Sequence, residues 1–296
     1  MITIFSTPKN FEGIIDKHQN NALGSWRALS PDIEIIIFGD SKGSKEAAKV
    51  IDAKYIPKIK YSPFFTPILS DLFSTADKLA KYSIMTFINA DIILPDNFLS
   101  VVNLTSDTLN KFLMVGHRWD MNVEDSIDFI NKSESKIFWD RVQKDSKKHA
   151  CTGIDYFVYR KNQWKNIPDF IMGFPGYDNW MIWNARRKRI PILDASNLVR
   201  AIHQNHDVPR YKMHDNKTGK FQVVKRNQEI NKPLYKTKHL NLLDCTHTIL
   251  NGEILKINER NSKIRYWYKL TRVYPELSIP IKIIRRLYFR FLLMIK

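Results

Sequence analysis

An apolar run with two polar residues near its end most strongly constrains how this chain can fold. Residues 84–94 read Ile-Met-Thr-Phe-Ile-Asn-Ala-Asp-Ile-Ile-Leu, a pattern typical of a strand buried on both faces. Asn89 and Asp91 are two residues apart, so on a strand they point to the same side. In open α/β sheets ligands bind at this end of the strand, and the two oxygens suit a divalent cation that holds a nucleotide diphosphate. The alternative is a turn, which Asn and Asp also favour.

The first 40 residues predict a strand–helix–strand unit with short connections. Its elements are a strand at 2–6, a helix at 11–29 and a strand at 33–38. Pro31 ends the helix before the second strand. Such a unit pairs its strands in parallel, and the carboxyl ends of parallel strands meet at one edge of the sheet. Thr7 and Asp40 are therefore expected at the same crevice as Asp91, where a nucleotide would bind.

The order of several short motifs makes residues 1–207 resemble the GT-A glycosyltransferases, in particular the family 2-like members. The motifs are the opening Ile-Phe-Ser-Thr, Gly39-Asp40, Thr66-Pro67 with residues 70–73, Asn89-Ala90-Asp91, residues 173–180 and residues 202–207. The resemblance implies an α/β fold, a Rossmann-like mixed sheet flanked by helices, with a donor-binding half at about 1–105 and an acceptor half at about 106–207. It also implies transfer of a sugar from a nucleotide-diphosphate donor, with a UDP-sugar favoured.

The resemblance also implies a metal site. In GT-A enzymes an Asp-x-Asp motif holds Mn²⁺ or Mg²⁺ on the donor diphosphate, and the matching ligand here is Asp91. Asn89 stands in place of the first Asp, so we expect it to contact the ribose or a metal-bound water. GT-A enzymes often complete the site with a late histidine, for which His203 is the candidate and His206 the reserve. Two histidines three residues apart also occur in ordinary polar loops.

A glycine-punctuated loop at 173–176 leads to the candidate base, Asp178. A carboxylate beside the acceptor can take the proton of the hydroxyl as its oxygen attacks the anomeric carbon, which is direct displacement with inversion. Related GT-A families carry an acid in a similar context, but retaining members also place acids nearby, so the stereochemistry stays open. Either Tyr177 or Trp180 is expected to stack on an acceptor sugar. The alternative for Asp178 is a helix N-cap.

Two further charged residues stand in apolar surroundings. Asp155 lies within the strand-like run 153–159, and Arg118 follows the apolar run 112–115. A carboxylate inside such a strand needs a partner. One possibility is an ion pair between Asp155 and Arg118. The alternative is that Asp155 binds an acceptor hydroxyl and Arg118 binds the donor phosphates.

Basic residues are concentrated near the end of the chain. The net charge is +17, and from residue 254 onward eleven Lys or Arg stand against two Glu. Apolar residues at helical spacing beside basic ones predict an amphipathic cationic helix in a tail at 263–296. Such a helix binds an anionic membrane surface, where a lipid-linked acceptor is within reach; the alternative is a helix packed on the core. Residues 208–262 are expected to wrap the catalytic domain and to form a hairpin at Asn251-Gly252.

Composition narrows the function classes. With 44% apolar residues, the 296-residue chain is expected to form one sizeable α/β domain with an appendage. Two distant cysteines and the lack of a signal or an apolar run of about 18 residues favour the cytoplasm. The motifs of nucleic-acid binders are missing, and the first loop lacks the glycines of nucleotidyltransferases. We therefore expect no nucleic-acid partner, and a glycosyltransferase on the inner membrane face that acts on a glycan or lipid-linked acceptor in cell-surface polysaccharide synthesis. An inactive scaffold or polyanion-binding protein is the alternative.

Overall fold

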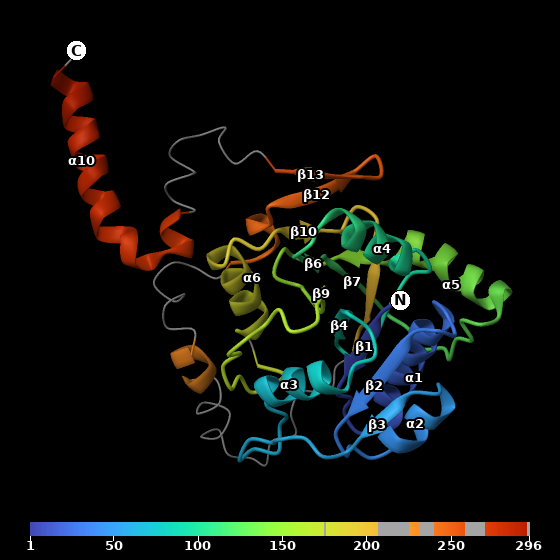
Figure 1. Ribbon diagram of the computed structural model, residues 1–296. Coiled ribbons are helices and arrows are strands. Elements are labelled where there is room, and N and C mark those ends of the chain that lie inside the picture. The colour runs from blue at the N-terminus through green and yellow to red at the C-terminus, as the bar shows by residue number, and fades with distance from the viewer. Residues whose placement is uncertain (175, 207–224, 231–239, 258–269, 295–296) are drawn as a thin grey trace.

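The fold is built on one large mixed sheet with helices on both faces (Figure 1). The computed structural model describes residues 1–174, 176–206, 225–230, 240–257 and 270–294. The predicted wrapping segment 208–262 and the tail 263–296 are therefore described only in part, and Asp207 of the last motif lies outside the described residues.

Two sheets contain the strands of the described residues. The large sheet consists of β1 (Thr3–Ser6), β2 (Glu34–Phe38), β3 (Lys54–Ile56), β4 (Ile84–Ile88), β6 (Leu113–Val115), β9 (Tyr156–Arg160), β10 (Ile192–Asp194), β12 (His247–Leu250) and β13 (Glu253–Lys256). In space its strands follow the order β13-β12-β10-β6-β9-β4-β1-β2-β3. The small sheet consists of β5 (Ile92–Ile93), β11 (Ala201–Gln204), β7 (Arg118–Met121) and β8 (Lys147–Lys148), in that spatial order.

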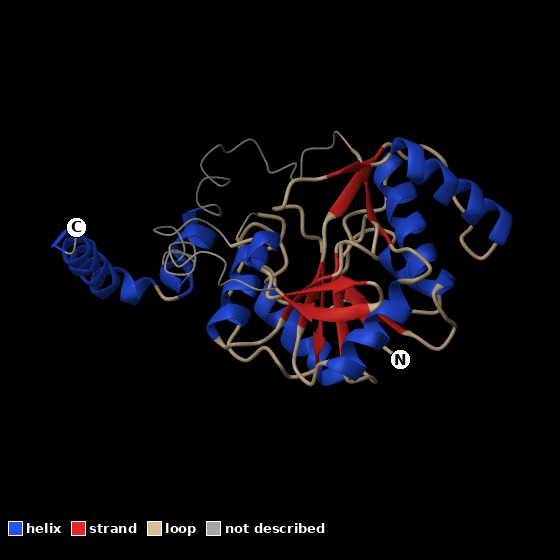
Figure 2. Ribbon diagram, turned by 90° about the horizontal axis from the view of Figure 1, so that it is seen from above, coloured by secondary structure: helices blue, strands red, loops and turns tan. Residues whose placement is uncertain are grey.

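The helices are α1 (Gly13–Ala28), α2 (Ser44–Val50), α3 (Leu69–Leu79), α4 (Phe98–Thr108), α5 (Lys132–Asp145), α6 (Tyr177–Arg187) and α10 (Ser278–Met294), with 3-10 turns η1 (Leu242–Asp244) and η3 (Pro275–Leu277). Helices cover the large sheet on both sides, while α5 packs on the small sheet and α10 lies apart (Figure 2). One apolar cluster joins the sheet to α1, α2 and α4, and another joins the opposite face to α3 and α6.

The predicted strand–helix–strand unit is confirmed. β1 pairs in parallel with both β2 and β4, and α1 makes the connection between β1 and β2. β1 and β4 are buried along their whole length, as their mainly apolar sequences predict for a strand covered on both faces. β9 runs antiparallel to β4 and β6, which makes the sheet mixed. The predicted fold class, a Rossmann-like mixed sheet flanked by helices, is therefore confirmed.

Alternation along β1 distributes its side chains between the two cores. Ile4 belongs to the cluster that contains Trp26 of α1, whereas its neighbour Phe5 belongs to the opposite cluster. The Phe5 ring meets Phe73 of α3 edge to face, with ring centroids 5.2 Å apart. The apolar packing on both faces holds the strand ends rigidly, and the polar groups described below lie at those ends.

The hairpin prediction is also confirmed. β12 and β13 are antiparallel and are joined by Asn251 and Gly252, whose φ angles of 50° and 78° are those of a type I′ turn. β12 pairs in parallel with β10, so the hairpin extends the large sheet. The division of the chain at residue 207 stays a prediction.

The last described helix, α10, projects away from the sheet (Figure 1). Among the described residues no helix has both the length and the apolar character that crossing a membrane requires.

Candidate metal and donor site

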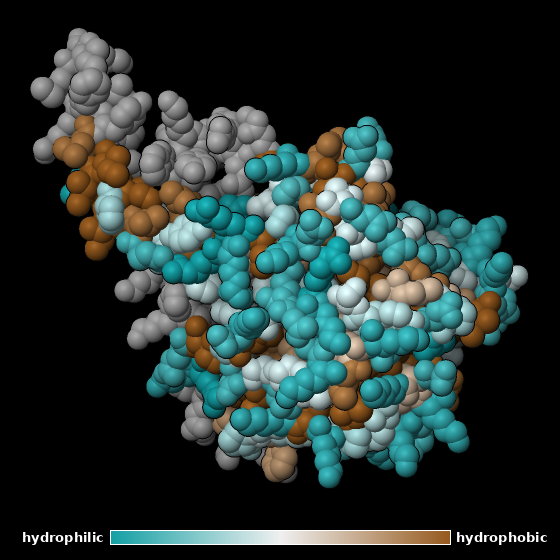
Figure 3. Space-filling model, viewed as in Figure 1, coloured by the Kyte–Doolittle hydropathy of each residue, from teal (hydrophilic) through white to brown (hydrophobic). Residues whose placement is uncertain are grey.

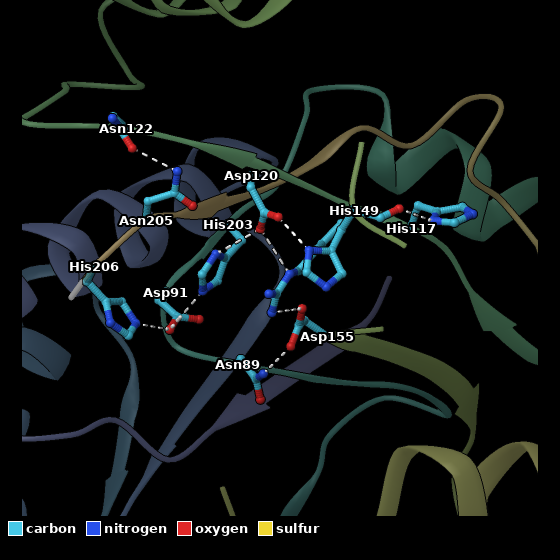
Figure 4. A network of polar contacts seen from close by, with 11 residues as sticks. Asn89, Asp91, His117, Asp120, Asn122, His149, Asp155, His203, Asn205 and His206 are labelled. Carbon is cyan, nitrogen blue, oxygen red and sulfur yellow. Dashed lines mark hydrogen bonds and ion pairs between the residues drawn. The ribbon is translucent and has the colours of Figure 1, made fainter. Parts of the chain in front are cut away.

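The candidate site is built where the large and small sheets meet. Asp91 lies in the turn between β4 and β5, and β5 pairs antiparallel with β11, which sets His203 opposite Ile92. His206 follows β11 by two residues. This strand pairing brings Asp91 together with two histidines that follow it by more than a hundred residues in the chain, as the motif order predicts (Figure 4).

The three side chains form a compact group of possible ligands. Nε2 of His206 is 3.4 Å and Nε2 of His203 is 3.9 Å from Oδ2 of Asp91. Ligand atoms from all three lie within 4.8 Å of one another. Bonds of about 2.0–2.2 Å to a shared cation require separations close to these. Oδ1 of Asp91 is buried and accepts no hydrogen bond from the described residues, so it retains lone pairs for a cation. The residues therefore fit a divalent metal ion.

Electrostatics keep this group in its metal-binding form. Burial by itself would raise the pKa of Asp91. The hydrogen bond from His206, and the positive charges that His203 and Lys9 carry at the acid pH where this carboxyl titrates, outweigh burial and hold the pKa below its usual value. Burial lowers the pKa of His203, against the attraction of Asp91, so the imidazole is neutral at physiological pH. An ionised carboxylate and a neutral imidazole are the states that bind metals.

Asn89 and Asp91 do not share one side of a strand, in contrast to the prediction. β4 ends at Ile88, so both residues lie in the following turn rather than on one side of a strand. The amide Nδ2 of Asn89 donates to Oδ1 of Asp155 at 2.5 Å, and its oxygen accepts from the Tyr177 hydroxyl at 3.4 Å. The turn alternative therefore describes the backbone, while Asp91 still faces the predicted histidines.

Arg118 pairs with Asp155, one of the two partners predicted for it. Its Nη1 is 3.1 Å from Oδ2 of Asp155, and its Nε is 3.0 Å from Oδ1 of Asp120. The side chains of Arg118 and Asp155 are only 11% and 10% exposed. These contacts hold the guanidinium between two carboxylates, and a role on the donor phosphates stays a prediction.

Asp120, two residues after Arg118 in the sequence, connects the polar groups. Its Oδ2 accepts a hydrogen bond from Nδ1 of His149 at 2.5 Å, and its Oδ1 is 3.1 Å from Nδ1 of His203 (Figure 4). A continuous path of polar contacts therefore runs from the possible metal ligands through Asp120 and Arg118 to Asp155.

The candidate base, Asp178, lies in the first turn of α6. The N-cap of this helix is Gly176, so the N-cap alternative for Asp178 is wrong; instead the Gly176 N–H donates to Oδ1 of Asp178 at 3.2 Å. Burial raises the pKa of Asp178 and the charge of Asp155 adds to the rise, while backbone N–H groups oppose it. A carboxyl group with a raised pKa is better suited to accept a proton near neutral pH.

The two predicted acceptor-stacking rings are largely buried. Trp180 is 6% exposed and its ring packs against Phe170. Packing along α6 directs the Trp180 side chain into the apolar cluster, so the indole is part of the core. This contradicts the prediction that it stacks on a sugar. Tyr177 is 8% exposed, but its hydroxyl reaches Asn89 and so belongs to the polar path.

Thr7 and Asp40 follow the carboxyl ends of the parallel strands β1 and β2, and their place at the donor crevice stays a prediction. A Cβ added to Gly39, which has φ of 92°, would lie 3.3 Å from Oγ1 of Thr7 and 3.0 Å from the hydroxyl of Tyr61. That hydroxyl donates to Oδ1 of Asp40 at 2.8 Å. Burial, together with Asp40, raises the pKa of Tyr61 to about 12. Tyr61 was not predicted, because it lies outside the quoted motifs.

Helix α1 contributes further polar side chains, and these are buried. His18, Gln19 and Asn21 are buried although they are polar, an arrangement that usually means a specific partner. Oε1 of Gln19 accepts from the backbone N–H of Lys9 at 2.7 Å, and the backbone oxygen of His18 accepts from Gln204 at 2.7 Å. Polar residues on the buried side of a helical pattern are the sequence signal that would have revealed these side chains.

Comparison with known proteins reveals likenesses among solved structures only. No family model and no curated protein matches the chain. TarS 1–349 from S. aureus in complex with UDP-GlcNAc is 14% identical, with a TM-score of 0.34, over 42% of this chain and 36% of that one. Glucosyl-3-phosphoglycerate synthase from Mycobacterium tuberculosis, in complex with Mn²⁺, UDP and phosphoglyceric acid, is 12% identical, with a TM-score of 0.46, over 81% and 80% of the two chains. A mannosyltransferase from Pyrobaculum calidifontis, in complex with GDP-Man and Mn²⁺, is 12% identical, with a TM-score of 0.45, over 78% and 64%.

One of these structures is a mannosyltransferase, and the three hold UDP-GlcNAc, UDP or GDP-Man, ligands of the class that the motifs predict. The chain spans less than half of the length of the TarS chains that it matches. Because every one of these TM-scores is below 0.5, the proposals that follow depend on the geometry of the site.

Proposed function

We propose that this protein is a metal-dependent glycosyltransferase that moves a sugar from a nucleotide-diphosphate donor to an acceptor hydroxyl. The observation that carries the proposal is the Asp91, His203 and His206 group at the carboxyl edge of a nucleotide-binding type of sheet. Thr7 and Asp40 rim the same edge on the side of β1 and β2. The arrangement suits a nucleoside at the rim and its diphosphate at the metal ligands.

The donor atoms favour Mn²⁺ over Mg²⁺. Two imidazole nitrogens and one carboxylate oxygen form the group, and Mg²⁺ prefers oxygen ligands. A bound divalent ion would supply Lewis-acid stabilisation of the charge that develops on the leaving diphosphate. Lys9, whose charge is close enough to lower the pKa of Asp91, adds a second positive group for the same phosphates.

Asp178 is proposed as the base. As the acceptor oxygen bonds to the anomeric carbon, the bond from that carbon to the diphosphate breaks and the hydroxyl proton passes to the carboxylate of Asp178. This single displacement inverts the configuration of the sugar. Tyr177, the neighbour of Asp178 in α6, donates to Asn89, and Asn89 donates to Asp155, so hydrogen bonds connect the helix of the base to the polar path.

Thermal unfolding with nucleotides tests the donor site. The protein is heated with UDP, GDP, CDP or TDP, with and without Mn²⁺, beside Asp91→Ala and the control Asp96→Ala, which changes an exposed acid five residues away. A nucleotide at a hundred times its Kd stabilises by about 2.7 kcal/mol, a rise in Tm of about 4 °C for a 296-residue chain. We expect one nucleotide, UDP by preference, to give this rise with metal in the wild type and the control but not in Asp91→Ala. If no nucleotide moves the transition, an inactive scaffold becomes the better hypothesis.

For the acceptor we propose a glycan or lipid-linked molecule at the inner membrane face, in cell-surface polysaccharide synthesis. The support comes from α10, where Ile279, Ile283 and Leu287 recur every four residues and are 69%, 53% and 59% exposed. Lys282 and Arg286 are exposed beside them, and the space-filling view shows brown apolar atoms along this helix (Figure 3). An apolar face flanked by cations suits the interface of an anionic membrane.

Vesicle sedimentation tests the membrane contact. Replacing Lys282 and Arg286 by Glu removes two cations, each of which contributes about 1 kcal/mol near an anionic surface, so binding to phosphatidylglycerol vesicles should fall by about 30-fold or more. The control replaces Lys45 and Lys49 of α2 by Glu, the same change of charge on an exposed helix elsewhere. Equal binding by wild type and the α10 variant, or equal binding to neutral phosphatidylcholine vesicles, would contradict the proposal.

A further inference from the structure

We infer that Asp120 is a positioning residue for the metal site: its carboxylate keeps the proton of His203 on Nδ1 and so leaves Nε2 free to bind the cation. The inference rests on the proposed metal role of Asp91, His203 and His206. It adds a residue that contacts neither the cation nor the donor and acts through one ligand.

Strand register sets the two residues side by side. β7 and β11 are parallel neighbours, and Asp120 is the register partner of His203. Partner residues on adjacent strands project to the same face of a sheet, so the carboxylate and the imidazole meet through backbone pairing rather than through a flexible loop. Both side chains are largely buried, with 24% of Asp120 and 12% of His203 exposed.

The two ring nitrogens of His203 face different groups. Nδ1 is 3.1 Å from Oδ1 of Asp120, whereas Nε2 is 3.9 Å from Oδ2 of Asp91 (Figure 4). The first contact is a charge contact rather than an aligned hydrogen bond, so its effect on the proton is electrostatic. A neutral imidazole carries one proton, and a negative oxygen beside Nδ1 favours the tautomer that has the proton there. The lone pair then lies on Nε2, which points toward the other two ligands.

Asp120 is itself held in place. Its second oxygen accepts the hydrogen bond from Nδ1 of His149 at 2.5 Å, and Nε of Arg118 is 3.0 Å from its first oxygen. Arg118 is fixed in turn by Asp155. The hydrogen bond to one oxygen and the charge contacts to the other hold the carboxylate beside His203, so we infer that it orients this histidine and does not compete as a ligand. Carboxylates that orient metal-binding histidines in this way contribute strongly to metal affinity.

The other histidine of the group lacks such support. Nδ1 of either histidine is buried without an aligned hydrogen bond to the described residues, but a carboxylate oxygen lies 3.1 Å from Nδ1 of His203 and the described residues place none at Nδ1 of His206. Only His203 is therefore prepared in one tautomer before the cation arrives. This asymmetry predicts that a change at Asp120 acts through His203 alone.

Mn²⁺ titration calorimetry of Asp120→Asn tests the inference. We expect the variant to bind Mn²⁺ about 10- to 100-fold more weakly than the wild type, the usual effect of losing such a carboxylate. The control Asp125→Asn makes the same chemical change in an exposed pair with Arg141 and should leave the affinity unchanged. Thermal unfolding without metal confirms that each variant is folded.

A double-mutant cycle separates positioning from simple loss of charge. If Asp120 acts through His203, Asp120→Asn lowers the affinity by less than about 2-fold when His203 is already Gln. An equal loss in both backgrounds would mean that Asp120 acts as a distant negative charge, and the inference would be overturned.

Nitrogen NMR of ¹⁵N-histidine-labelled protein without metal gives a second measurement. The His203 signal, identified among the eight histidines by its absence in His203→Gln, should show the Nδ1–H tautomer in the wild type and a mixture in Asp120→Asn. An Nε2–H tautomer in the wild type refutes the inference. If the wild type binds no Mn²⁺, the proposed metal site and the inference both fail; if it binds and Asp120→Asn binds equally well, only the inference fails.

Discussion

Replacing Arg118 by Met would leave two carboxylates without the cation that lies between them. Arg118 contacts Asp155 at 3.1 Å and Asp120 at 3.0 Å, and the three side chains are 11%, 10% and 24% exposed. Met preserves an unbranched stem of similar length, so the change removes the charge more than the packing. The two acids keep other partners, Asn89 for Asp155 and His149 for Asp120, but neither of these supplies a permanent positive charge.

Removing one member of a buried ion pair costs about 3–5 kcal/mol, and the partners that remain place Arg118→Met near the lower bound, at about 3 kcal/mol. With an unfolding entropy of about 2.1 cal/mol/K per residue, a 296-residue chain loses about 5 °C of Tm for this change. Adding Asp155→Asn should restore part of the loss, because the uncompensated charge is then gone while the oxygen that accepts from Asn89 is retained.

Differential scanning calorimetry measures these changes, with Arg141→Met as the control because Arg141 pairs with Asp125 at an exposed position. The control should lower Tm by less than about 1 °C. A change this small in Arg118→Met would refute the argument that the guanidinium holds two carboxylates together. If Tm is unchanged and UDP affinity is lost, the donor phosphates would be the principal partner of Arg118.

Two further predictions follow from the pKa shifts. Burial raises the pKa of Asp178 in the folded state, so ionisation of this carboxyl lowers the stability of the protein as pH rises through that pKa. The variant Asp178→Asn should therefore melt at or above the wild-type Tm, which calorimetry measures. Its rate of sugar transfer should fall by about 10²- to 10⁴-fold in a transfer assay. A loss of rate below 10-fold would rule out the role of base. Burial lowers the pKa of His18 below its usual 6.5, so the unfolded chain takes up the proton first and the free energy of unfolding should fall as pH drops below about 6.5. His18→Gln should reduce this slope in urea titrations at pH 7 and pH 5; an unchanged slope would assign the pH dependence to other groups.

The elements whose pattern is local were predictable. Mainly apolar runs predicted β1, β2 and β4, because a strand covered on both faces is rich in apolar side chains along its length. Asn251 and Gly252 predicted the hairpin because these residues tolerate the positive φ of its turn. Motif order, rather than any periodicity, pointed to Asp91, His203 and His206, and the structure brings these three together.

Side-chain direction at the ends of elements was not predictable from spacing. The two-residue spacing of Asn89 and Asp91 implies one side only while the strand continues, but β4 ends at Ile88 and the turn sends Asn89 to Asp155. Trp180 was predicted to stack on a sugar, but the packing of α6 on the large sheet buries its ring in the apolar core.

The sequence by itself determined which segments become strands and helices, because hydrophobic period and turn chemistry are properties of a few neighbouring residues. It also determined the inventory of carboxylates and imidazoles available at the strand ends. Tertiary structure alone decided which of them meet: the pairing of β5, β11 and β7 sets His203 between Asp91 and Asp120. Strand neighbours and register depend on the folding of the whole sheet, where a shift of one residue would turn each of these side chains to the opposite face.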